Sequence, residues 1–108
     1  MKKIVFDPHA IQDIAESVIY YNREQAGVGF RFRDDVRKTT NKIIKRPDLY
    51  TYVEKPFRAY RMQRLHHTIY YHDSREILYI LAVLHQSRHP DLWKERIKKI
   101  QGFKTRQK

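Results

Sequence analysis

The stretch Ile77-Leu-Tyr-Ile-Leu-Ala-Val-Leu84 is apolar throughout and is the longest such run in the chain. Its length suits a strand and falls well short of the roughly 20 residues that span a bilayer. A continuous apolar run of this size is typical of a central strand that is buried on both faces. We therefore predict a strand over residues 76–85 in the middle of a sheet, and no membrane-spanning segment.

Further strands are predicted on both sides of this one in the sequence. Residues 57–64 and 65–72 are rich in aromatic and β-branched side chains, and the turn Asp73-Ser74-Arg75 connects the second of them to the apolar strand. Residues 2–6 predict one more short strand. The expected sheet has about four strands and is mostly antiparallel.

Two amphipathic helices are predicted between the first strand and the others. Asp7 and Pro8 form a helix-start signal. The first helix is expected to end before Gly27 and Gly29, and the second before Pro47. Apolar residues recur at helical spacing in each, at Ile11, Ile14, Ala15, Val18 and Ile19 in the first helix and at Phe32, Val36, Thr40 and Ile43 in the second.

A third helix is predicted over residues 90–100, where Trp93, Ile97 and Ile100 follow at i, i+4 and i+7. Trp93 is expected to anchor this helix. The predicted fold is α+β, in the order β-α-α-β-β-β-α, with a helical hairpin on one face of the sheet and the other face partly open. We expect a single domain over residues 1–108, with 102–108 as a flexible basic tail.

The charge is high and unevenly distributed. The net charge is +11, and residues 56–108 contain 12 Lys/Arg against 4 Asp/Glu, compared with 11 against 8 in residues 1–55. Such a field attracts nucleic acids and acidic proteins. The chain contains no cysteine, which excludes disulfides and thiolate sites and fits a cytoplasmic protein.

Two clusters contain side chains suited to chemistry. Arg61 and Arg64 precede His66-His67, and in a straight strand the two histidines point to opposite faces, which disfavours a shared metal. His85 and Arg88 follow the apolar strand, where a rigid scaffold would hold an acid–base group and a phosphate clamp. The alternative is that these residues are solvated charges at strand ends. No nucleotide-binding or zinc-protease motif is present, and we expect neither a metal nor a cofactor.

The ordered set of these features resembles the ParE/RelE superfamily of toxins over nearly the whole chain. It comprises Pro8, Ala10, Asp13-Ile14, Tyr20-Tyr21, Gly29-Phe30, Arg46-Pro47, the strand from Arg61 through His67 and Ile69 to Tyr71, the strand from Ile80 to His85, Arg88 and Pro90. The stretch Arg61-Met-Gln-Arg-Leu-His-His67 and the strand end Val83-Leu-His85 look closer to ParE.

The resemblance implies the toxin of a type II toxin–antitoxin system, which inhibits bacterial growth. ParE-type toxins poison DNA gyrase, and RelE-type toxins cut mRNA on the ribosome. Both are bound in a hetero-oligomer by a cognate antitoxin that wraps the toxin with its C-terminal segment. The chain lacks the C-terminal tyrosine common in the nucleases, so gyrase is the expected target and mRNA cleavage is the alternative.

The resemblance also implies which residues act. Under the RelE alternative the chain is an endoribonuclease, and the matching catalytic positions are Arg61, His85 and Arg88. Under the ParE interpretation it is not an enzyme. The expected target-binding residues are Arg61, Arg64, His67, Tyr71, Arg88 and Trp93.

Overall fold

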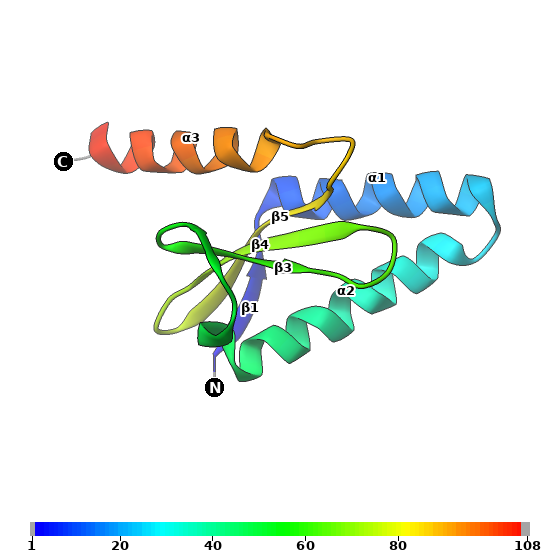
Figure 1. Cartoon of the computed structure of the whole chain (residues 1–108), viewed down its shortest axis with the longest axis horizontal. Coiled ribbons are helices and arrows are strands. Elements are labelled where there is room, and N and C mark those ends of the chain that lie inside the picture. The colour runs from blue at the N-terminus through cyan, green and yellow to red at the C-terminus, as the bar shows by residue number, and fades with distance from the viewer. Residues whose placement is uncertain (1, 107–108) are drawn as a thin grey trace.

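The computed structural model describes residues 2–106, with side chains as far as Ile100. The elements in chain order are β1 (Lys3–Phe6), α1 (Pro8–Glu24), α2 (Val28–Lys45), the 3-10 turn η1 (Pro47–Leu49), β2 (Tyr52–Glu54), β3 (Phe57–Arg61), β4 (His67–Asp73), β5 (Ile77–His85) and α3 (Leu92–Arg106). Figure 1 shows α1 and α2 as a hairpin beside the sheet, with α3 following the last strand.

The sheet has five strands in the order β1-β5-β4-β3-β2. β1 runs parallel to β5, and the other neighbours are antiparallel. The predicted α+β class and mostly antiparallel sheet are therefore confirmed. The sequence analysis missed the edge strand β2, because its three residues are all exposed and show no apolar alternation.

β4 occupies the middle of the sheet, and β5 is an interior strand beside it, buried on both faces as its composition predicts. β5 lies between β1 and β4, and the side chains of Leu78 and of residues 80–84 are buried. A β-bulge where Tyr70 and Tyr71 of β4 pair with Ala82 and Ile80 shifts the alternation of side chains along β5. Leu78, Ile80 and Val83 consequently belong to one core cluster, and Leu81, Ala82 and Leu84 to the other.

The helical hairpin covers the first of these clusters. α1 begins with Asp7 as N-cap, whose carboxylate accepts the N–H of His9 at 2.8 Å. The two helices approach most closely at Gly29, where a Cβ atom would lie 2.1 Å from the carbonyl oxygen of Val18. Only glycine permits this approach, which explains a glycine inside the first turn of α2.

The buried face of α2 is the predicted one, but that of α1 is partly wrong. Ile11 and Ile19 are 57% and 54% exposed, whereas Ala10, Ser17 and Tyr21 are buried. Small side chains at positions 10 and 17 let α1 approach β5, and Ser17 meets a buried histidine. A prediction from the spacing of apolar residues alone puts these isoleucines on the buried face of α1. The face predicted in this way is displaced by about one position along the sequence.

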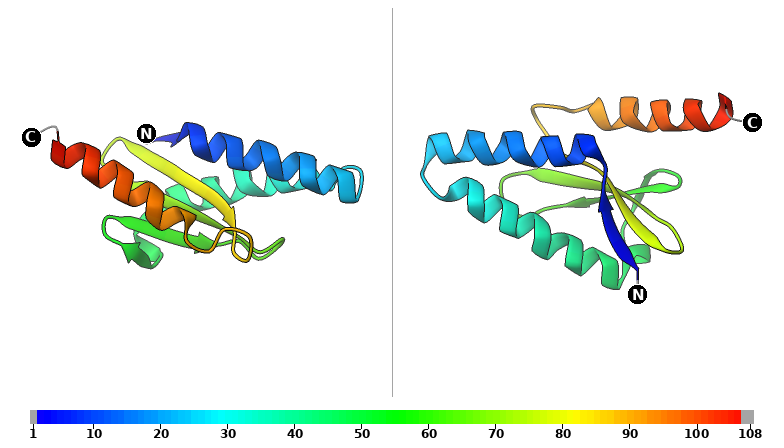
Figure 2. Two further views of the ribbon diagram at one scale, coloured as in Figure 1. Left: turned by 90° about the horizontal axis from the view of Figure 1, so that it is seen from above. Right: turned by 180° about the vertical axis from the view of Figure 1, so that it is seen from behind.

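α3 covers the second core cluster, on the face expected to be partly open. Figure 2 (left) shows α1 and α3 on either side of β5. Ile97 is fully buried, and the ring of Trp93 stacks on Tyr70 with 5.3 Å between centroids and 11° between planes. The expected tail is helical as far as Arg106, and residues 107–108 lie outside the described part of the chain.

Trp93→Ala is expected to lower the free energy of unfolding by about 2 kcal/mol, because the partly buried indole leaves a void over Tyr70. Trp93→Phe keeps an aromatic ring in place and should cost about 1 kcal/mol or less. Urea denaturation followed by far-UV circular dichroism measures both. Equal stability of the alanine variant and the wild type would show that the stacking does not hold α3.

Candidate functional site

A small polar cavity lies where β5 ends against α1. Its volume is about 50 Å³, and its lining includes Glu16 and Ser17 of α1 and His85 and Arg88 at the end of β5. The guanidinium of Arg88 lies 4.5 Å from the ring centre of Tyr20, a cation–π contact that holds it against α1. The structure therefore brings together two of the predicted residues, His85 and Arg88.

His85 is partly exposed at the mouth of this cavity. Its Nδ1 accepts the backbone N–H of Ser87 at 3.1 Å. Burial lowers its pKa, and the positive charge of Arg88 and the neighbouring His66 and His89 lower it further. A histidine with a lowered pKa is neutral at physiological pH, and because Nδ1 accepts the N–H of Ser87, Nε2 holds the proton of the neutral ring.

Arg61 lies on the other face of the sheet. In the ladder Arg61 pairs with Thr68, which pairs with Leu84, and directly paired residues share a face. Leu84 packs in the cluster under α3, while the neighbouring pair His67 and His85 faces α1. Arg61 and His85 thus point to opposite sides of the sheet, and the three residues expected for a nuclease do not converge.

His67 is a core residue and not a surface one. It is fully buried, with Nδ1 2.7 Å from the carbonyl oxygen of Leu65 and Nε2 3.3 Å from Oγ of Ser17. A carbonyl only accepts, so Nδ1 holds the proton and Nε2 accepts from the serine hydroxyl. Burial lowers the pKa of His67 to about 4, with the positive charges of His85 and Arg88 adding to the effect.

Tyr71, which was also expected to bind the target, is buried as well. Its hydroxyl donates to the carbonyl oxygen of Pro47 at 2.7 Å, joining β4 to the turn after α2. Burial raises its pKa. His67 and Tyr71 therefore cannot touch a macromolecular partner in this fold, and Trp93 presents only the part of its ring that Tyr70 leaves uncovered.

Arg64 lies in the turn between β3 and β4, where Leu65 and His66 adopt positive φ angles of 60° and 50°. This turn adjoins an open polar groove of about 250 Å³, which is lined by Asp35, Lys38, Thr39, Lys42, Tyr60, Met62, Gln63 and Arg64. The N–H of Gln86 donates to the carbonyl oxygen of His66 at 3.0 Å. The end of β5 is therefore adjacent to this turn, and Arg61, Arg64 and Arg88 all lie at one end of the sheet.

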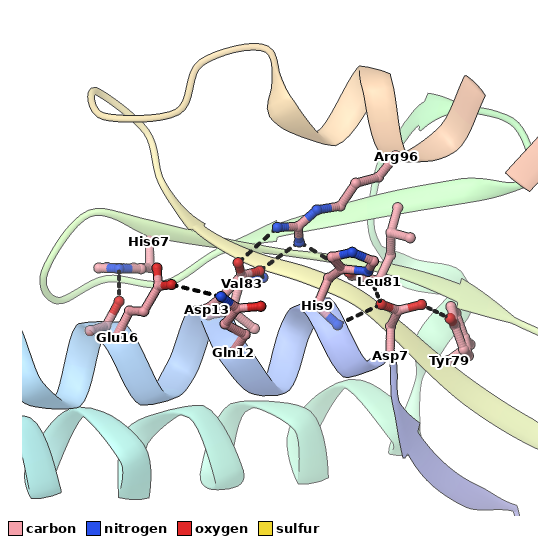
Figure 3. Close-up of polar contacts among 11 residues, drawn as sticks. Asp7, His9, Gln12, Asp13, Glu16, His67, Tyr79, Leu81, Val83 and Arg96 are labelled. Atoms are coloured by element: carbon pink, nitrogen blue, oxygen red, sulfur yellow. Dashed lines mark hydrogen bonds and ion pairs between the residues drawn. The ribbon is translucent and has the colours of Figure 1, made fainter. Parts of the chain in front are cut away.

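The sequence analysis missed a buried ion pair next to the cavity. Asp13 of α1 binds Arg96 of α3 through both carboxylate oxygens, at 2.7 and 2.8 Å, and Oδ2 also accepts the N–H of Val83 at 3.1 Å. Figure 3 shows Arg96 reaching over β5 to Asp13, with Asp7 and Tyr79 joined further along. No local pattern marks a pair separated by 83 positions.

Among the described residues, no group of three His, Asp or Glu side chains is arranged to hold a metal ion. Within the same part of the chain, no helix is both long and apolar enough to cross a membrane.

The family model of the "ParE toxin of type II toxin-antitoxin system, parDE" matches residues 4–90, most of the chain. The chain belongs to this family. The ParE segment comprises β1 to β5 and the hairpin, so α3 lies beyond it.

The solved structures include a similar one from "Chromosomal ParDE TA system from P. aeruginosa". The TM-score is 0.69 at 10% identity, and the match covers 77% of this chain and 94% of that one. At this identity the likeness supports the ParE-like fold alone. A search of the curated proteins finds no match.

Proposed function

We propose that this ParE-family toxin inhibits DNA gyrase in the cytoplasm and is neutralised there by a cognate antitoxin. Family membership supports the toxin role. The observation that carries the choice of gyrase over mRNA is the placement of Arg61 and His85 on opposite faces of the sheet. A nuclease needs its acid, base and charge-stabilising groups within hydrogen-bond reach of one ribose phosphate.

The target surface we propose is the cationic end of the sheet, defined by Arg61, Arg64 and Arg88. All three are exposed, and guanidinium groups bind carboxylates and phosphates with two hydrogen bonds. Trp93, whose side chain is partly exposed, is proposed as a further contact with the target.

Purified toxin is expected to stop gyrase from supercoiling relaxed plasmid. The triple variant Arg61→Ala, Arg64→Ala, Arg88→Ala should need at least about tenfold more toxin for the same inhibition, because interface arginines are frequent hot spots. The matched control replaces three exposed arginines elsewhere, Arg31, Arg37 and Arg75, and should act like the wild type. Full gyrase activity at saturating wild-type toxin would exclude gyrase as the target.

The alternative, ribosome-dependent mRNA cleavage, retains one supporting observation: His85 and Arg88 line the same cavity. It predicts codon-positioned cuts in primer extension that disappear with His85→Ala. Under the gyrase proposal no such cuts occur, and His85→Ala leaves inhibition unchanged.

For the antitoxin we propose an amphipathic or acidic segment in the groove between β1 and the hairpin. This groove has a volume of about 270 Å³, and its walls include the apolar Phe6, Ile14 and Val36 and the cationic Arg33 and Arg37. The other face of the sheet is already covered by α3. Co-expression with the adjacent open reading frame tests this pairing: a small protein that co-purifies with wild type and not with the variant Arg33→Glu, Arg37→Glu, which reverses two exposed charges of the groove, supports it.

A further inference from the structure

α3 contains a large share of the charge for its length. Residues 91–108 contain seven Lys/Arg and two Asp/Glu, a net +5 of the chain's +11, whereas the family-matched residues 4–90 contribute only +4. The extra charge therefore belongs to an element that the ParE family model does not include.

The inner side of α3 is fully used in packing against the domain. Leu92, Trp93, Ile97 and Ile100 pack in the second core cluster, and Arg96 is bound by Asp13. α3 is thus a docked helix, and the side chains described along it, as far as Ile100, leave no spare apolar face for a lipid surface.

The outer side of α3 presents Lys94 and Lys98, and Lys99 lies on the flank towards α1, where it lines a hollow with Asp7 and His9; all three lysines are exposed. Lys94 lies 3.5 Å from Asp91, an exposed pair worth little, and Glu95 lies among the three. Among the described side chains, neither Lys98 nor Lys99 has a carboxylate within ion-pair distance. Arg61 lies on this same face of the sheet, so the positive surface continues past the helix.

We propose that the outer side of α3 binds the phosphate backbone of duplex DNA. Lysines on a rigid element neutralise phosphates and release counterions without reading sequence. Single-stranded nucleic acid is a poorer fit, because its binding relies on free aromatic platforms and Trp93 is already stacked on Tyr70. The contact would concentrate this toxin on DNA, and it does not depend on gyrase being the target.

The test is fluorescence anisotropy of a short labelled duplex of arbitrary sequence, titrated with the full chain at several salt concentrations between about 50 and 200 mM. Two triple variants are compared. The α3 variant combines Lys94→Gln, Lys98→Gln and Lys99→Gln, and the charge-matched control combines Lys3→Gln, Lys38→Gln and Lys45→Gln, also at exposed positions. The α3 variant should bind about tenfold or more weakly, and its slope of log K against log salt should be less steep by about 3, since each lost contact removes about 0.9.

The control should lose little affinity, because charges beyond about 10 Å are screened at these salt concentrations. Equal weakening of both variants would overturn the proposal, as would wild-type toxin that does not bind the duplex at about 50 mM salt. Polyglutamate that binds α3 as tightly as DNA does would instead identify an acidic protein as the partner. No gyrase is present, so this result is independent of the supercoiling assay.

Discussion

Asp13→Asn is expected to lower the free energy of unfolding by about 3 kcal/mol. The side chains of Asp13 and Arg96 are only 9% and 13% exposed, so the variant leaves a guanidinium desolvated without its counter-charge. It also weakens the hydrogen bond to the N–H of Val83, in the buried strand β5. Chemical denaturation at neutral pH measures the loss.

The matched comparison is a double-mutant cycle with Arg96→Met. This substitution alone should cost less, because Asp13 keeps the N–H of Val83 and methionine retains much of the apolar stem. The double variant should be more stable than the sum of the single effects predicts, since no lone charge remains. Additive losses would mean that the two side chains do not depend on each other.

Stability is expected to fall by about 3 kcal/mol between pH 6.5 and 4 through His67 alone. Its pKa is about 4 in the folded protein, and an unfolded histidine has a pKa of about 6.5. As the pH falls, the unfolded chain therefore takes up the proton first, which favours unfolding. The stabilisation is complete above about pH 6.5 and is lost by about pH 4.

The adjacent histidine provides the control for this prediction. The same substitution at the exposed neighbouring position, His66→Gln, is the control for the exchange of a histidine for glutamine. His67→Gln removes the titrating group and should flatten the curve over this interval, although its stability at neutral pH falls. A curve for His67→Gln as steep as that of the wild type would assign the acid sensitivity to other groups.

The elements that could be predicted from sequence are those whose burial shows as local periodicity. The apolar run of β5 and the buried stripe of α2 are both confirmed. The alternation that groups His67, Ile69 and Tyr71 on one face is also correct, since all three face the hairpin. Alternation does not reveal whether the hairpin covers that face. For this reason His67 and Tyr71, which are buried, were expected at the surface.

The site depends on contacts between distant segments, which leave no local signal. Asp13 has the same appearance in the sequence as any exposed helical carboxylate until α3 brings Arg96 to it. Ser17 is buried where its hydroxyl donates to the second ring nitrogen of His67, a contact between residues 50 positions apart. The sequence alone permits Arg61 and His85 to share a catalytic site. Only the strand register shows that their side chains lie on opposite faces of the sheet.

The parallel pairing of β1 with β5 also affects when the toxin matures during synthesis. Lys3 pairs with Ile77 and Phe6 with Ile80, so the first strand has no neighbour until residues 77–80 have been made. Ribosomes add about 5 to 20 residues per second, and such long-range contacts form late. The sheet is therefore expected to form only after β5 has been synthesised. A nascent chain that stalls before Ile77 lacks the strand with which β1 pairs, and we expect it to be inactive.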